Sequence, residues 1–268
     1  PRRNAPAWLG SKWCTTYGEA TARRIAEAHL QEAELDLSVK HDPDDWAKNL
    51  GGIVLPMGSV RLAAGGRVDA FGGFEEGAWW VQDAAAAIPA RLLGDVSGKS
   101  IADLCAAPGG KTAQLAAAGA NVTAVDSSDK RLERLRENLV RLQLNATVIA
   151  ADATTWQPGE QFDAVLLDAP CSGTGTLRRH PDIAHLKSAK DIAELGALQA
   201  KLLSHAATLV KPGGSLIYCT CSLEPEEGEN QIARFLEDTP DFVQDGISTD
   251  ESDGEKEWVN DEGEVRNV

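Results

Sequence analysis

Residues 103–112 read DLCAAPGGKT; they follow SIA (100–102) and precede AQLAAAGANVTAVD (113–126). An apolar strand, a glycine-rich turn, a helix and a second apolar strand come in that order, as in the first unit of a doubly wound parallel sheet. The end of the turn, GKT, also closes the phosphate loop G-x-x-x-x-G-K-[ST]. That loop requires a glycine at position 105, where this chain has Cys105, and Pro108 has no N–H to donate. We therefore interpret the turn as a different kind of binding loop.

The rest of the chain continues the alternation of strand and helix. From about residue 75 the candidate segments are 77–93 (helix), 129–144 (helix), 146–152 (strand), 162–170 (strand), 193–210 (helix) and 214–222 (strand). This pattern predicts an α/β fold with a doubly wound, mostly parallel sheet over residues 71–268. Residues 1–70 predict a small α+β region, with a helix in 13–33 and strands at 35–39 and 58–62. An acidic segment covers 245–264.

Composition limits the classes of function. The net charge of −15 weakens a nucleic-acid hypothesis, but residues 222–268 carry 16 of the 41 acidic residues and only three of the 26 basic ones. The remainder is therefore close to neutral, and an acidic terminal segment is commonly a solvated tail. The five cysteines include no C-x-x-C pair, which argues against a disulfide framework and a metal site. With no run of 18 apolar residues, we expect a soluble, cytoplasmic protein without a membrane partner.

Acidic or reactive residues follow all five predicted strands, at the edge where ligands bind in such sheets. They are Asp103, Asp126, Asp152, Asp168-Ala169-Pro170-Cys171 and Cys219-Thr220-Cys221. Any single acid could instead be a helix N-cap. Asp126 is placed to accept the hydroxyls of a ribose, which NAD and S-adenosylmethionine share, but the loop lacks the G-x-G-x-x-G spacing of dehydrogenases.

We therefore predict S-adenosylmethionine as the cofactor and a Rossmann-like sheet of the class I methyltransferase type. Asp126 would bind the ribose, Asp152 would lie near the adenine amino group, and Asp168 would lie near the methionine end together with the 105–111 loop. The loop residues are Cys105, Ala106, Ala107, Pro108, Gly109, Gly110 and Lys111.

The two cysteine segments, DAPCSGTG (168–175) and YCTCSLEPEEGE (218–229), indicate covalent chemistry. An unactivated carbon such as C5 of a pyrimidine becomes nucleophilic only after a thiolate adds to C6. Cys221 could supply the nucleophile, Asp168 a carboxyl group that holds or protonates the N3/N4 edge of the pyrimidine, and Cys171 a base that helps the final elimination. Burial in the core is the alternative, which we favour for Cys14 and Cys219.

Four ordered motifs, FEEGAWWVQDAAA (74–86), DLCAAPGGKT, LLDAPCSGTGTLRRHPDI (166–183) and YCTCSLEPEEGENQI (218–232), resemble the RNA cytosine-5 methyltransferase family of the Sun, Fmu and NSUN type. The resemblance implies that Cys221 is the nucleophile and that Cys171 assists breakdown of the covalent RNA adduct. It carries the cofactor pattern onto residues 105–111, Asp126, Asp152 and Asp168.

The leading segments PAWLGSKWCTTYGE (6–19) and ELDLSVK (34–40) are similar to the small domain before the catalytic domain of the bacterial small-subunit rRNA enzymes. This favours rRNA over tRNA as the RNA partner. The chain lacks the helical RNA-binding domain and the final DGFF-like strand usual in that type, so we expect a fragment. The sequence does not indicate an oligomeric state.

RNA contacts are predicted at Arg178 and Arg179, which follow the Pro-Cys segment; pairing of Arg179 with Asp182 is the alternative. Lys111 could approach the catalytic residues or simply pair with Asp168. Two further functions stay open: a non-covalent amine methyltransferase, in which both cysteines would be dispensable, and a non-catalytic RNA-binding module. The same covalent chemistry on tRNA is a third alternative.

Overall fold

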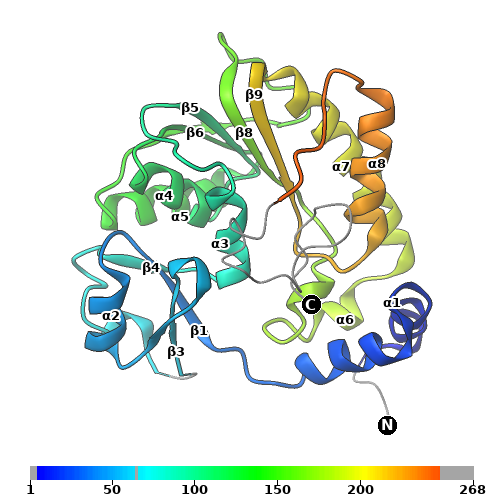
Figure 1. Ribbon diagram of the computed structural model, residues 1–268, viewed down its shortest axis with the longest axis horizontal. Helices are drawn as coiled ribbons and strands as arrows, with labels where there is room; N and C mark the ends of the chain where they lie inside the picture. The colour runs from blue at the N-terminus through cyan, green and yellow to red at the C-terminus, as the bar shows by residue number, and fades with distance from the viewer. Residues whose placement is uncertain (1–4, 64–65, 248–268) are drawn as a thin grey trace.

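The computed structural model describes residues 5–63 and 66–247, which form two β-sheets with their helices (Figure 1). Most of the predicted acidic segment, residues 248–264, lies outside the described residues. No helix in the described part of the chain has the length and apolar character needed to cross a membrane.

The N-terminal part begins with helix α1 (Ala7–Ala28), which contains a non-helical residue at Gly18. It continues into a four-stranded antiparallel sheet in the order β2 (Ile53–Val54), β3 (Val60–Leu62), β1 (Leu35–Val39) and β4 (Trp79–Val81). Helix α2 (Pro43–Leu50) and two 3-10 turns, η1 (Pro56–Gly58) and η2 (Val68–Ala70), complete this part. The predicted strands at 35–39 and 58–62 are thus present.

The expectation of one helix over 77–93 is wrong in its first half. Trp79 and Trp80 lie in β4, which pairs with β1, and both indoles are buried. Helix α3 (Ala84–Arg91) begins only after Asp83, whose side chain accepts a hydrogen bond from the Ala85 N–H and caps the helix. The β-sheet propensity of WWV and this cap together outweigh the apolar periodicity.

The main sheet has five parallel strands in the order β7-β6-β5-β8-β9. They are β5 (Ser100–Leu104), β6 (Asn121–Asp126), β7 (Thr147–Ala150), β8 (Phe162–Asp168) and β9 (Val210–Cys219). The strand order reverses beside β5, so the ligand crevice is expected at the carboxyl ends of β5 and β8. The predicted Rossmann-like fold is confirmed.

Helices cover both faces of this sheet (Figure 1). On one face, α3 and α4 (Gly110–Ala117) pack on Ala164 and Leu166 of β8, and α5 (Asp129–Arg141) packs on Ala124 of β6. On the other, α7 (Ala189–Thr208) and α8 (Glu229–Asp238) pack on Val165 and Leu167. Three short helices, η3 (Thr174–Thr176), α6 (Ile183–Leu186) and η4 (Pro225–Glu227), lie in the segments that follow β8 and β9. Strand alternation thus fixes which side chains each helical layer meets.

Candidate active site

The parallel pairing of β8 with β9 brings the two cysteine segments together. Asp168 lies opposite Cys219 in the ladder, and the chain then runs on to Cys171 and Cys221. The Sγ atoms of Cys171 and Cys221 are 3.1 Å apart, and the Gly175 N–H donates to the Cys221 carbonyl at 3.0 Å. Cys221 is exposed whereas Cys171 is half-buried, so a substrate can reach Cys221 more readily.

The contact between the two sulfur atoms separates their acidities. The hydrogen bond from Cys171 lowers the pKa of Cys221 despite the opposing effect of burial. The same hydrogen bond and burial raise the pKa of Cys171 well above its ordinary value. Since the thiolate is the reactive form of cysteine, these directions and the greater exposure of Cys221 favour Cys221 as the nucleophile and Cys171 as a neutral thiol.

Beside the cysteine pair, Lys111 reaches from the start of α4 to Asp168, with Nζ 2.7 Å from Oδ2. Burial opposes the charged ammonium, but the Asp168 carboxylate with which it pairs stabilises the charge, and the pKa of Lys111 is raised. Cys219 is the last residue of β9, and its Sγ lies 3.5 Å from Asp168 Oδ1. Burial raises the pKa of Cys219, which therefore stays a thiol. Asp168, at the carboxyl end of β8, thus lies between the Lys111 ammonium and the Cys219 thiol.

The predicted cofactor loop lies at the carboxyl end of β5. Cys105 has φ 60°, and Gly109 has φ 100° and serves as the N-cap of α4. A Cβ at Gly109 would meet Leu135 Cγ at 2.8 Å, so the tight loop depends on glycine there. The Ala106 N–H bonds to the Val125 carbonyl and the Gly109 N–H to the Ala106 carbonyl.

Two acids predicted to bind the cofactor follow the next strands. Asp126 is buried; its Oδ2 accepts the Ala107 N–H at 3.2 Å, and its Oδ1 accepts the Ser128 N–H and Arg131 Nη2. Asp152 is exposed and accepts two hydrogen bonds from Thr154, which lower its pKa.

Asp103 leaves one buried acceptor atom at this edge. Its Oδ2 accepts the Thr112 hydroxyl at 2.5 Å, while Oδ1 is buried without a hydrogen-bond partner among the described residues. Burial raises the pKa of Asp103 to about 7, against the effect of Thr112. A bound group carrying a positive charge or an N–H would satisfy that atom, so the residues here fit a ligand with an amino-acid moiety.

Arg178 and Arg179, the predicted RNA contacts, both pair with Asp83. Arg178 Nη2 lies 3.2 Å and Arg179 Nη2 2.7 Å from Asp83 Oδ2, and Arg179 also donates to the Glu34 carbonyl. Arg179 therefore pairs with the cap of α3 and not with Asp182. The Arg178 side chain is 31% exposed and the Arg179 side chain 27% exposed.

Sequence reasoning missed four residues around the cysteines: Ser172, Gln199, Ser222 and Glu227. Glu227 is fully buried and accepts hydrogen bonds from the other three. The only signals in the sequence were the serine that follows each cysteine and the acids of EPEEGE (224–229).

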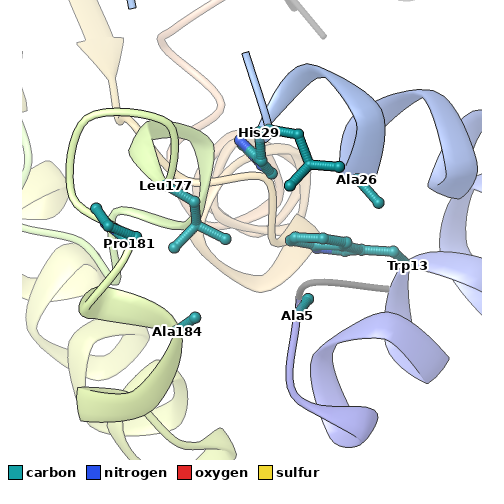
Figure 2. A pocket seen from close by; sticks show the side chains of 8 residues that line it. Ala5, Trp13, Ala26, His29, Leu177, Pro181 and Ala184 are labelled. Atoms are coloured by element: carbon teal, nitrogen blue, oxygen red, sulfur yellow. The ribbon is translucent and has the colours of Figure 1, made fainter. Parts of the chain in front are cut away.

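A separate cavity of about 130 Å³ lies between α1 and the segment after η3 (Figure 2). Trp13, Leu177, Pro181 and His29 are among its lining residues, and no residue of the cysteine cluster lines it. Burial, with a contribution from Arg178, lowers the pKa of His29 to about 4, so its imidazole is neutral at pH 7.

In the described residues, no group of three His, Cys, Asp or Glu side chains could hold a metal ion.

Comparison with known proteins assigns the family. The model of a family described as 16S rRNA methyltransferase RsmB/F matches residues 90–265. The chain belongs to this family. It is 42% identical over 93% of its length to ribosomal RNA small subunit methyltransferase B of Cronobacter sakazakii, and 43% identical over 94% to that of Klebsiella pneumoniae. It spans 61% and 62% of those relatives.

Solved structures agree with this assignment. A methyltransferase homologue from Pyrococcus horikoshii is 31% identical, with a TM-score of 0.77 over 88% of this chain and 80% of that one. NSun6 from the same organism, solved with SFG, is 20% identical with a TM-score of 0.77 over 88% of both chains, and shows the shared fold.

Proposed function

We propose that this chain is an S-adenosylmethionine-dependent RNA methyltransferase that forms 5-methylcytidine in small-subunit rRNA through a covalent Cys221–C6 intermediate. The observation that carries the proposal is the Cys171–Cys221 contact at 3.1 Å beside Asp168 and Lys111. Membership of the RsmB/F family supports an rRNA substrate. An amine methyltransferase has no use for two facing thiols at this edge, because an amine nitrogen needs no activation by addition.

In the proposed reaction, the Cys221 thiolate adds to C6 of cytosine and the displaced π electrons make C5 nucleophilic. The carboxyl group of Asp168 binds the N3/N4 edge of the base, and Lys111 holds that carboxyl in place. C5 would bond to the methyl group as the methyl–sulfonium bond breaks and a neutral thioether leaves. C5 would then lose its proton to a base, and the C6–Sγ bond would break to expel Cys221 as thiolate, which restores the aromatic ring. Cys171, in contact with the Cys221 sulfur, assists this last step by donating to it.

The cofactor would supply an electrophilic methyl group on a sulfonium. Asp126 is assigned to its ribose, Asp152 to its adenine amino group, and the 105–111 loop with Asp168 to its methionine end. Since Arg131 already lies 2.7 Å from Asp126 and is 55% exposed, we expect its side chain to share or leave that carboxylate when the cofactor binds.

The remaining assignments follow the same scheme. Residues 1–70 would form a small RNA-contacting region before the catalytic part at 71–268, and Arg178 and Arg179 would contact phosphates. All five cysteines lie in the described part of the chain as free thiols, and this fits a reducing cytoplasm.

The test is mass spectrometry of the Cys171→Ala variant incubated with S-adenosylmethionine and a 16S rRNA fragment, with Cys171→Ala/Cys221→Ala as control. We expect a protein–RNA adduct in the single variant and none in the double. Methylated product from the double variant would overturn the covalent mechanism and favour the amine-type alternative. An adduct formed with tRNA but not with rRNA would overturn the substrate assignment.

A further inference from the structure

Glu227, the last residue of η4, is a carboxylate with no exposed surface. Its Oε1 accepts the Ser172 N–H at 2.9 Å and Gln199 Nε2 at 3.1 Å. Its Oε2 accepts the Ser222 hydroxyl at 2.6 Å and the Ser172 hydroxyl. Within the described residues, no Lys or Arg lies at ion-pair distance from it. Four donors therefore compensate a charge that is costly to bury.

These donors come from both cysteine segments. Ser172 follows Cys171 in the chain and Ser222 follows Cys221, so one carboxylate joins the two loops next to their sulfur atoms. Gln199, on α7, also donates to the Pro170 carbonyl at 2.8 Å and so anchors the first loop to a helix. A buried apolar side chain would fill the same space at lower cost in solvation, which indicates that the hydrogen bonds to the loops are what the carboxylate provides.

The charge of Glu227 also affects the acidity of Cys171. Together with the Cys221 hydrogen bond, burial and the charge of Cys221, it raises the pKa of Cys171. Cys171 thus stays protonated and can donate to the Cys221 sulfur, and this hydrogen bond is the main cause of the lowered pKa of Cys221. The charge of Glu227 and the hydrogen bond from Cys171 therefore both widen the difference in acidity between the two thiols.

We propose that Glu227 is a positioning residue that ties the Cys171 and Cys221 loops together and keeps Cys171 as the thiol that donates to Cys221. This inference rests on the proposed function, because it takes Cys221 as the nucleophile. Glu227 itself touches the serines and the glutamine, and acts on the reaction through them.

Two variants separate the charge from the hydrogen bonds. In Glu227→Gln, the amide oxygen can accept from the Ser172 N–H and Gln199, while the NH₂ donates to the two hydroxyls after they rotate, so only the charge is lost. Glu227→Ala removes both charge and hydrogen bonds. Glu226→Gln is the matched control, because the adjacent Glu226 side chain is 48% exposed and pairs with Lys12 instead.

The experiment measures the rate of iodoacetamide alkylation at each cysteine between pH 6 and 10, by peptide mass spectrometry, in the full chain without RNA or cofactor. In Glu227→Gln the curve for Cys171 should move to lower pH. For each pH unit of movement, the thiolate fraction rises about tenfold. Because nucleophilicity falls about threefold over that interval, alkylation below the midpoint accelerates about threefold. In Glu227→Ala the difference in rate between Cys221 and Cys171 should shrink further.

The proposal is overturned if both curves in Glu227→Gln superimpose on those of the wild type and of Glu226→Gln. If Glu227→Ala does not fold, as circular dichroism will show, the Gln variant decides alone. Alkylation is measured without methyl transfer, so the proposal for Glu227 and the proposed function can be refuted independently. Shifted curves in a chain that does not methylate RNA would support Glu227 and overturn the proposed function; unshifted curves in an active enzyme would do the reverse.

Discussion

Gly175 offers a direct test of how closely the two cysteine loops approach each other. A Cβ added there would lie 2.9 Å from the Cys221 carbonyl oxygen, whereas close carbon–oxygen contacts are ordinarily about 3.3–3.6 Å. The opposing atom belongs to the backbone, so Gly175→Ala must move the Cys221 segment by about 0.5 Å. A misplacement of about 1 Å costs about 100-fold in rate, so this shift predicts about a tenfold loss of methyl transfer.

The same substitution has a cost in stability. Overpacking of this kind costs about 1–3 kcal/mol. Stretching the Gly175 N–H bond to the Cys221 carbonyl adds up to about 1 kcal/mol. With about 2–4 °C per kcal/mol for a chain of this size, a net loss of about 2 kcal/mol lowers Tm by roughly 4–8 °C.

Gly159→Ala is the matched control, because a Cβ there meets nothing within 4 Å. It carries the same reduction of unfolded-state entropy, worth about 0.4–1 kcal/mol, without the clash. The assays are transfer of labelled methyl groups to a 16S rRNA fragment and thermal melting followed by circular dichroism. Equal rates and equal Tm in the two variants would show that the loops do not meet as described, and would refute the argument.

Two further predictions concern charged groups at the sheet edge. Burial raises the pKa of Asp103 to about 7, against the opposing effect of Thr112. The unfolded state therefore releases a proton that the folded state keeps. The free energy of unfolding should fall by up to about 1.4 kcal/mol per unit between pH 4 and 7. Asp103→Asn should lack this fall. Urea titrations at pH 5, 6 and 7 measure the free energy of unfolding of the wild type and the variant. An equal dependence of that free energy on pH in the two proteins would contradict the prediction. Lys111→Met removes a cation that lowers the pKa of Cys221, so alkylation of Cys221 should require a higher pH; an unchanged midpoint would mean that Lys111 acts on Asp168 alone.

Much of the sheet was predictable because its signals are local. Alternating apolar segments and the DLCAAPGGKT turn place β5 to β9, and each candidate acid lies at or just beyond the carboxyl end of the strand expected from the pattern. The boundary of α3 was not predictable from periodicity, since Trp79 and Trp80 suit a helix or a strand and only pairing with β1 decides between them.

The ion pairs of Arg178 and Arg179 could not be predicted from neighbouring residues in the sequence. Charge pairing within a few residues suggested Asp182 as the partner of Arg179, but the fold brings Asp83, 96 residues away in the chain, into contact with it. Long-range ion pairs depend on how the loops pack against α3, and no spacing rule in the sequence encodes that.

Hydrophobic periodicity and motif spacing are properties of the chain, so they were enough to predict the fold class, the acids at the strand ends and the two cysteine segments. The contact between the sulfur atoms, the greater acidity of one thiol and the hydrogen bonds from both loops to Glu227 became visible only in the folded protein. Acidity and hydrogen bonding depend on distance and burial, which arise only when β8, β9 and η4 pack together.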